Sequence, residues 1–239
     1  MRLRDLLALC DQISPFELQE SWDNSGLIIG DPDQAIGEVV CALEADEAVI
    51  AAAPENATLL VHHPLIFGAL KRLDFSTYPA NLIQKILHKN LSLIALHTNF
   101  DKTHLNRFVA EEILGWQNFT CEGHLCLTET TVGFEALLET VRTKLHPNPR
   151  LLRPTREVRR VALCTGSGAS LLDGDKFDCL LTGDIKYHDA MAARSLGVGL
   201  IDIGHYESER HFGAILVDAL KANGITAIMA DSENPFLAP

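Results

Sequence analysis

Two short segments, far apart in the chain, each contain a histidine followed four positions later by a carboxylate. They are HTNFD at 97–101 and HYESE at 205–209, and each comes directly after a short apolar run. A third apolar run ends in the adjacent pair His62 and His63. Imidazole and carboxylate groups together bind zinc, iron or manganese, whereas calcium and magnesium prefer oxygen ligands alone. The sequence therefore predicts metal ligands at His62, His63, Asp101, His205 and Glu209.

The pattern favours two ions over one. Successive side chains of an extended strand point in different directions, so His62 and His63 can each bind a separate ion. Asp101 and Glu209 supply negative charge for two divalent cations, and one carboxylate can bridge both ions. We therefore expect two divalent metal ions per chain, with zinc, iron and manganese all compatible with these ligands.

The elements that must position these residues alternate along the chain. Short apolar runs typical of buried strands are separated by segments with helical spacing of apolar residues. The expected strands fall at 39–45, 58–61, 91–96, 158–166, 179–184, 198–204 and 225–231. Alternating strands and helices predict an α/β protein whose largely parallel sheets are covered by helices on both faces.

The second half of the chain repeats the plan of the first. VVCALEA at 39–45 matches RVALCTG, TLLVHHP matches CLLTGDI, and LIALHTNFD matches IDIGHYESE without a gap. We interpret this as an internal duplication that gives two similar three-layer α/β/α lobes. The predicted boundaries are a first lobe at 1–120, a connector at 121–155 and a second lobe at 156–239.

Open parallel sheets bind ligands at the carboxyl ends of their strands, where these histidines and carboxylates fall. His97 and His188 are the candidate acid/base residues. Asp184 and Lys186 could bind substrate, but a helix-capping role is slightly favoured for Asp184. The isolated histidines His104, His146 and His211 have no matching carboxylate and are expected to have structural roles.

The segment WDNSGL at 22–27 allows two interpretations. Asp23 and Asn24 can simply shape a turn while Trp22 packs on the core. The same residues can instead line a pocket beside the metal ions. We favour the structural role with some pocket contact.

Bulk composition narrows the function classes. The chain has 239 residues and a formal net charge of −12, which argues against nucleic acid as the main partner. Its apolar runs are shorter than the roughly 20 residues that span a bilayer, so a soluble cytoplasmic protein is expected. Cys121, His124 and Cys126 lie close together but lack a second ligand pair for zinc. All six cysteines are expected to be reduced thiols.

Five segments, WDNSGLIIG, VHHPLIF, LHTNFD, TGDIKYHDA and GHYESE, occur in this order between residues 22 and 209. Together they resemble the GTP cyclohydrolase I type 2 family, also called NGG-interacting-factor-three-like proteins. The resemblance implies two similar lobes, a toroidal homohexamer and a metal pair bound by the same five residues. It also implies that His97 lies close to the metals. The segment DKTHLNRF departs from the small, glycine-rich segment usual in relatives.

Two classes of function follow. The first is a dinuclear metal-dependent hydrolase, in which the metals lower the pKa of a bound water. With GTP as substrate, hydrolysis would open the guanine ring at C8 and release formate. His97 would transfer protons, and Lys186 would bind the phosphate groups. A metal-dependent phosphoesterase is the alternative within this class. The second is a non-catalytic metal-binding scaffold or regulator.

Overall fold

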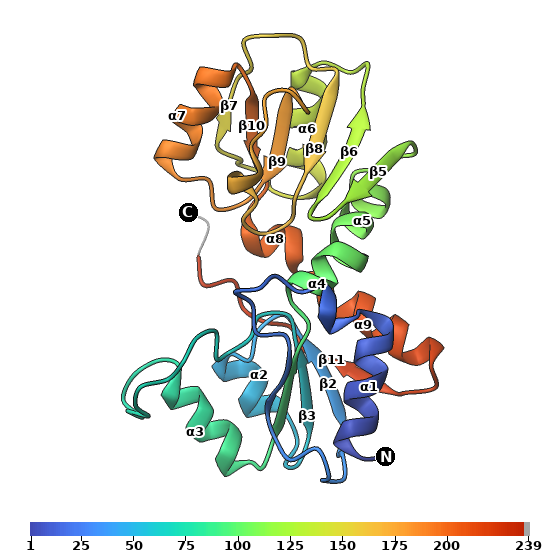
Figure 1. Cartoon of the computed structure of the whole chain (residues 1–239), viewed down its shortest axis with the longest axis vertical. Helices are drawn as coiled ribbons and strands as arrows, with labels where there is room; N and C mark the ends of the chain where they lie inside the picture. Colours follow the sequence, from blue (N-terminus) through green and yellow to red (C-terminus); the bar gives the residue numbers. More distant parts are fainter. Residues whose placement is uncertain (237–239) are drawn as a thin grey trace. The chain divides into compact units, whose positions relative to one another are not determined.

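The computed structural model describes residues 1–236 as two compact units, each built around its own β-sheet (Figure 1). The first unit contains Met1–Phe100 and the chain from Arg210 onward, and the second contains Asp101–Glu209. Both sheets are mixed, and helices pack against each of them, which confirms the predicted α/β class. Within the described residues, no helix combines the length and apolar character that crossing a membrane requires.

The sheet of the first unit has the order β1-β4-β3-β2-β11. Its strands β2, β3, β4 and β11 run parallel, and β1 pairs antiparallel with β4 at one edge. The strands are β1 (Gly26–Ile29), β2 (Val39–Ala42), β3 (Thr58–Val61), β4 (Ser92–Ala95) and β11 (Ala227–Met229). Because β2, β3 and β4 are buried along their whole length, they read as continuous apolar runs.

Helices lie on both faces of this first sheet (Figure 1). They are α1 (Leu3–Ile13), α2 (Glu47–Ala52), α3 (Ala80–His88) and α9 (Phe212–Ala222), with a 3₁₀ turn at Phe16–Leu18. α2 and α3 pack against alternate residues of the strands, such as Leu59 and Val61, in one apolar cluster. Asp46 begins α2 by accepting a 2.8 Å hydrogen bond from the Val49 amide.

The sheet of the second unit has the order β5-β6-β8-β9-β10-β7. Only the pairs β8–β9 and β9–β10 are parallel, so the expectation of a largely parallel sheet is wrong here. The antiparallel pairs arise because β5 and β6 form a hairpin and β7 returns beside β10. The strands are β5 (Phe119–Glu122), β6 (Leu125–Glu129), β7 (Leu151–Leu152), β8 (Arg160–Leu163), β9 (Cys179–Thr182) and β10 (Gly199–Asp202).

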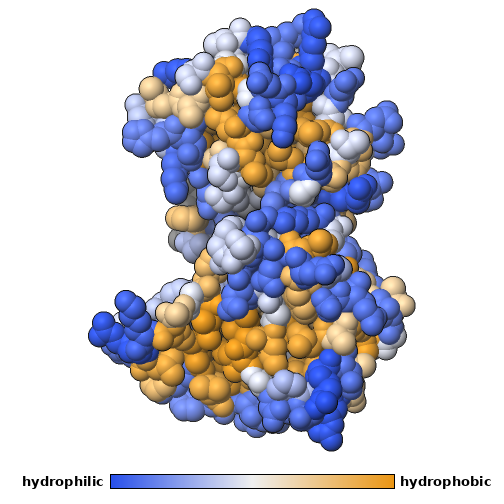
Figure 2. Space-filling model, in the orientation of Figure 1, coloured by the Kyte–Doolittle hydropathy of each residue, from blue (hydrophilic) through white to orange (hydrophobic). Residues whose placement is uncertain are grey.

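The helical segments complete the two units. Those of the second unit are α5 (Asn106–Phe108), α6 (Phe134–Lys144), α7 (Tyr187–Leu196), α8 (His205–Glu209), π-helical turns at Asp101–Leu105 and Val109–Ile113, and a 3₁₀ turn at Ala169–Leu171. α4 (Thr98–Phe100) ends the first stretch of the first unit. α6 packs on one face of the second sheet and α7 on the other. On the face shown in Figure 2, hydrophobic residues gather over the middle strands of both units.

The units divide at positions that differ from the boundaries expected at 120 and 156. β11 pairs with β2 and α9 packs on β2, so the end of the chain belongs to the first sheet. The segment expected as a connector, 121–155, supplies β6, α6 and β7 to the second unit. Short apolar strands such as Ala227–Met229 fit either sheet equally well by sequence.

The sequence segments that match between the two halves form strands in the same relative order in the two sheets. By the sequence alignment of the two halves, β2 corresponds to β8, β3 to β9 and β4 to β10. The first sheet has the parallel order β4-β3-β2, and the second has the corresponding parallel order β10-β9-β8. An antiparallel edge strand, β1 or β7, lies beside β4 or β10 respectively. Beyond β2 and β8 the sheets differ, since β11 is parallel and β6 is antiparallel.

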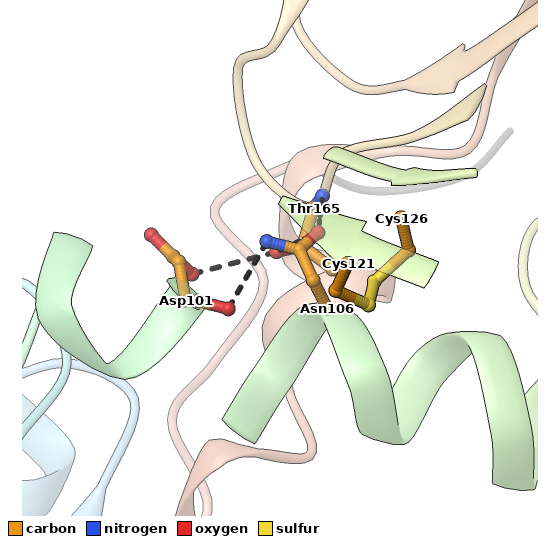
Figure 3. The surroundings of a disulfide bond; sticks show 5 residues. All are labelled: Asp101, Asn106, Cys121, Cys126 and Thr165. Carbon is orange, nitrogen blue, oxygen red and sulfur yellow. Dashed lines mark hydrogen bonds between the residues drawn. A yellow bond between two sulfur atoms is a disulfide. The ribbon is translucent and has the colours of Figure 1, made fainter. Parts of the chain in front are cut away.

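Cys121 and Cys126 form a disulfide, which corrects the expectation that all six cysteines are thiols (Figure 3). They face each other across the β5–β6 hairpin, with Cα atoms 4.0 Å apart. The disulfide also excludes the zinc-binding role considered for these two sulfur atoms. The other four cysteines, Cys10, Cys41, Cys164 and Cys179, are buried thiols as expected.

Candidate metal centre

Three imidazoles meet at one edge of the first sheet. His62 and His63 directly follow β3, and His97 follows the neighbouring parallel strand β4. Because Val61 and Ala95 are in register, the two strands end side by side. One ring nitrogen from each histidine lies within 4.8 Å of the others, as three ligands of one metal site would. This cluster includes two predicted ligands, His62 and His63, and the predicted acid/base residue His97.

Each of these imidazoles is oriented by a bond at Nδ1. The Nδ1 acceptors are the Leu96 carbonyl at 2.9 Å for His62, Glu44 at 2.5 Å for His63 and Asp23 at 2.8 Å for His97. A carbonyl or carboxylate in this position selects the tautomer with the proton on Nδ1, which leaves Nε2 without a proton, as metal coordination or general-base catalysis requires. Histidines that bind metal ions are commonly held in this way.

Asp23 is the residue whose importance the sequence interpretation underrated. Its side chain is fully buried and accepts hydrogen bonds from His97 and from the Thr98 amide and hydroxyl. Burial raises the pKa of Asp23, but the hydrogen bonds from His97 and Thr98 outweigh it and hold the pKa well below its usual range. Asp23 is therefore an anion that fixes the His97 ring, beyond shaping a turn.

The rest of the WDNS segment is also organised around His97. The Asn24 side-chain amide donates to the Ile66 carbonyl at 2.6 Å, and the Ser25 hydroxyl accepts from the His97 amide at 3.0 Å. The expected packing of Trp22 on the core is wrong, because this residue is 57% exposed and its ring lies 6.3 Å from the His97 ring. The pocket interpretation of this segment thus accounts for more of its contacts.

The second unit has its own group of candidate ligands, rich in carboxylates. On α8 the spacing i, i+4 places His205 and Glu209 on one face, and His205 Nε2 lies 3.0 Å from Glu209 Oε2. Carboxylate oxygens of Asp101 and Glu209 lie within 4.8 Å of each other. Both residues are buried, at 7% and 2% exposure. Two buried carboxylates at this separation repel, so their chemistry fits a bound divalent cation.

Gly166 makes room for the Glu209 carboxylate. A Cβ atom at this position would lie 2.1 Å from Glu209 Oε1, and Gly166 has a φ of +62° that favours glycine. The Gly166 amide donates to the Ser208 hydroxyl at 3.1 Å. Gly166 follows β8 in the segment CTGSG. Its position at the end of a strand was the sequence feature that could have identified it as a site residue.

Asp184 orients His205, and the expected capping role is wrong. Its carboxylate accepts from His205 Nδ1 at 2.7 Å, which leaves His205 Nε2 directed at Glu209. The N-cap of α7 is Lys186, whose amide donates to Asp189 at 2.9 Å. Asp184 also has a φ of +53°, in the left-handed region that few non-glycine residues adopt.

Asp101 begins a π-helical turn, a feature frequent at functional sites. The Asn106 side chain connects this turn to the end of β8: it donates to the Asp101 carbonyl at 3.1 Å and accepts from the Thr165 amide at 2.8 Å (Figure 3). The Thr165 hydroxyl lies 3.4 Å from Asp101 Oδ1. The segment DKTHLNRF thus forms helical turns that anchor Asp101.

The remaining candidate histidines are not members of the ligand groups found among residues 1–236. His188 is exposed on α7, where its ring packs edge-on against Tyr187, and its catalytic role stays a prediction. His104 bonds to the Thr103 hydroxyl, and burial lowers the pKa of both His104 and His211. His146 is partly buried beyond the end of α6.

Comparison with known proteins places these motifs in a family. The family model described as Duf34/NIF3 (NGG1p interacting factor 3) matches residues 1–235. The "GTP cyclohydrolase 1 type 2 homolog" of Campylobacter jejuni is 44% identical over 99% of both chains. The "GTP cyclohydrolase 1 type 2" of Helicobacter pylori strain 26695 is 39% identical over 98% of both. The crystal structure of Staphylococcus aureus protein SA1388 is 26% identical, with a TM-score of 0.87 over 100% of this chain and 99% of that one.

Proposed function

The chain belongs to the Duf34/NIF3 family, and on this basis we propose that it is a dinuclear metal-dependent hydrolase that opens the guanine ring of GTP at C8. The proposal that the chain binds metal ions rests on the pair of buried carboxylates, Asp101 and Glu209, beside His205. The names of the Campylobacter and Helicobacter relatives support GTP as the substrate.

We propose that His62, His63, Asp101, His205 and Glu209 bind the two ions together. Chain connectivity supports this proposal, because Asp101 and Glu209 are the residues at which the chain enters and leaves the second unit. Asp101 also follows His97 by four positions along a helical segment, a rise of about 6 Å. The ligand types fit zinc, iron or manganese.

Two bound cations would lower the pKa of a coordinated water, so that hydroxide would be present near neutral pH. The chain's own residues position and protonate the reactants. Asp23 holds a proton on His97 Nδ1, so His97 Nε2 is the atom that exchanges protons with the substrate. Lys186, exposed at the start of α7, supplies positive charge for the phosphates.

The test is to incubate purified protein of measured metal content with GTP and to follow formate and phosphate separately. We expect formate release, with Asp101→Ala lowering kcat/KM by at least about a hundredfold, since even residues that only orient ligands contribute 10- to 100-fold. Phosphate release without formate would favour a phosphoesterase. Absence of any turnover in a fully metal-loaded protein would contradict the enzyme proposal and favour a scaffold.

We also propose that the chain assembles as a homohexamer, as the family resemblance implies. Light scattering on metal-loaded and chelator-treated protein measures this directly. A monomer under both conditions would contradict the proposal without affecting the chemistry of the metal ligands.

A further inference from the structure

Two exposed aromatic side chains lie beside the imidazole cluster of the first unit. Trp22 is 57% exposed and Phe67 is 49% exposed, and their ring centroids are 5.7 Å apart with planes inclined by 33°. The His97 ring stands edge-on to both, 6.3 Å from Trp22 and 5.8 Å from Phe67. The indole and phenyl rings therefore form an exposed aromatic pair that borders His97.

The aromatic pair is held in place by hydrogen bonds to polar residues of the same unit. The Asn24 amide bonds to the Ile66 carbonyl at 2.6 Å, which ties the segment of Trp22 to the segment of Phe67. Asp23, between Trp22 and Asn24, holds the His97 ring at 2.8 Å. One short stretch of chain thus fixes both an imidazole of the candidate metal centre and the aromatic pair next to it.

We propose that Trp22 and Phe67 form the binding surface for the planar, fused heterocycle of the substrate, a purine base, and this rests on the proposed function. Large aromatic side chains exposed at a site bind flat rings by stacking, and such stacking is tolerant of which base is bound. A base stacked there would lie next to His97, the residue proposed to exchange protons with it.

Fluorescence provides a test that does not require turnover, because the chain has only two tryptophans, Trp22 and Trp116. In full-length Trp116→Phe protein the emission reports Trp22 alone. We expect GTP to quench it saturably and inorganic triphosphate, which has no base, to leave it unchanged. Equal quenching by both would overturn the proposal.

Substitutions measure the contribution of each ring to GTP binding. We expect Trp22→Ala and Phe67→Ala each to raise the Kd for GTP about tenfold, with Trp22→Phe restoring most of the affinity. Phe75→Ala is the matched control, because Phe75 is similarly exposed, at 44%, eight residues further along. If Trp22→Ala changes the mass in light scattering and leaves GTP affinity intact, a second copy covers this surface and the proposal is wrong.

The two proposals fail in different ways. GTP that binds at Trp22 without releasing formate contradicts the proposed reaction and supports the stacking surface. Formate release with an unchanged KM in Trp22→Ala contradicts the stacking surface and leaves the proposed reaction standing.

Discussion

The two groups of candidate ligands differ in charge. The first unit offers three imidazoles, which are neutral when they bind a metal, whereas the second offers two carboxylates and one imidazole. The imidazole group satisfies its Nδ1 atoms within the protein and can assemble without an ion. The carboxylate group brings like charges together in a buried place. We therefore expect a bound metal ion to stabilise the second unit more than the first.

The largest effect is expected from filling the space that the Glu209 carboxylate occupies. Gly166→Ala places a methyl group 2.1 Å from Glu209 Oε1, so the carboxylate must move. A misplacement of about 1 Å costs about a hundredfold in activity, and we expect a matching loss of bound metal, measured by elemental analysis.

Gly123→Ala is the matched control for this substitution. Gly123 has a similar left-handed φ of +57°, but an added Cβ meets nothing within 4 Å. Both variants carry the same backbone strain, so only Gly166→Ala should lose metal. Equal metal loss in both variants would show that strain, and not the Glu209 contact, is responsible.

The next largest effects are expected from substitutions of the carboxylates that orient His97 and His205. Asp23→Asn and Asp184→Asn keep the shape but remove the charge at His97 and His205. Asp184→Asn acts on a proposed ligand and should weaken metal binding 10- to 100-fold. Asp23→Asn acts on the proposed acid/base residue, so it should lower kcat and leave the metal affinity nearly unchanged.

Competition with a chromogenic chelator measures both affinities. Thermal unfolding of the metal-free variants shows whether the fold itself is changed. Formate release measures kcat for each variant. A loss of metal affinity in Asp23→Asn as large as that in Asp184→Asn would mean that His97 is itself a metal ligand.

A smaller effect is expected from substitution of Asp178, which directly precedes β9 in the second unit. The aligned residue in the first unit is Ala57. Asp178 accepts hydrogen bonds from the Arg159 and Arg160 amides at 3.0 and 2.8 Å and pairs with Arg156 at 2.9 Å. Asp178→Asn should lower the free energy of unfolding by about 2 kcal/mol at pH 7.

This contribution should depend on pH. Burial raises the pKa of Asp178, but the Arg160 and Arg159 amides and the arginine charges lower it below the usual 3.8. The stabilisation is therefore complete above about pH 4 and is lost as the pH falls further. Urea unfolding of both proteins at pH 7 and pH 3 measures the difference, and a gap that persists unchanged at pH 3 would contradict the assignment.

The smallest effect is expected from the disulfide of the β5–β6 hairpin, a feature of the second unit only. Cys121→Ser with Cys126→Ser opens a loop of a few residues, which should lower the free energy of unfolding by about 2 kcal/mol or less. Urea unfolding with and without dithiothreitol checks the same quantity in the unmodified chain. A change in metal content on reduction would show that the hairpin also affects Asp101.

The sequence predicted the buried parallel strands and the ligand types that follow them, but it missed β1, β5, β6 and β7 and did not assign strands to sheets. Buried parallel strands read as apolar runs, and the residues directly after them, such as His62 and His97, lie at their ends. β11 could not be assigned, because three apolar residues carry no information about which sheet they join. The Cys121–Cys126 pairing depends on hairpin register, which the sequence did not specify.

Asp23 and Asn24 show why some site residues were underrated. Both are typical turn formers, so their sequence context alone favours a local role. Their partners, His97 and Ile66, lie 74 and 42 positions away, and only the pairing of β1 with β4 brings the first of these contacts about. Polar residues before a short edge strand therefore deserve consideration as site residues.

The second unit is inserted into the first, since the chain leaves the first unit at Phe100 and returns to it at Arg210. During synthesis, residues 101–209 are complete while the first sheet still lacks β11, its edge strand next to β2. The unit that begins first is thus the last to finish. Substitutions that slow the pairing of β11 should expose the edge of β2 in the nascent protein, and such an open edge favours aggregation.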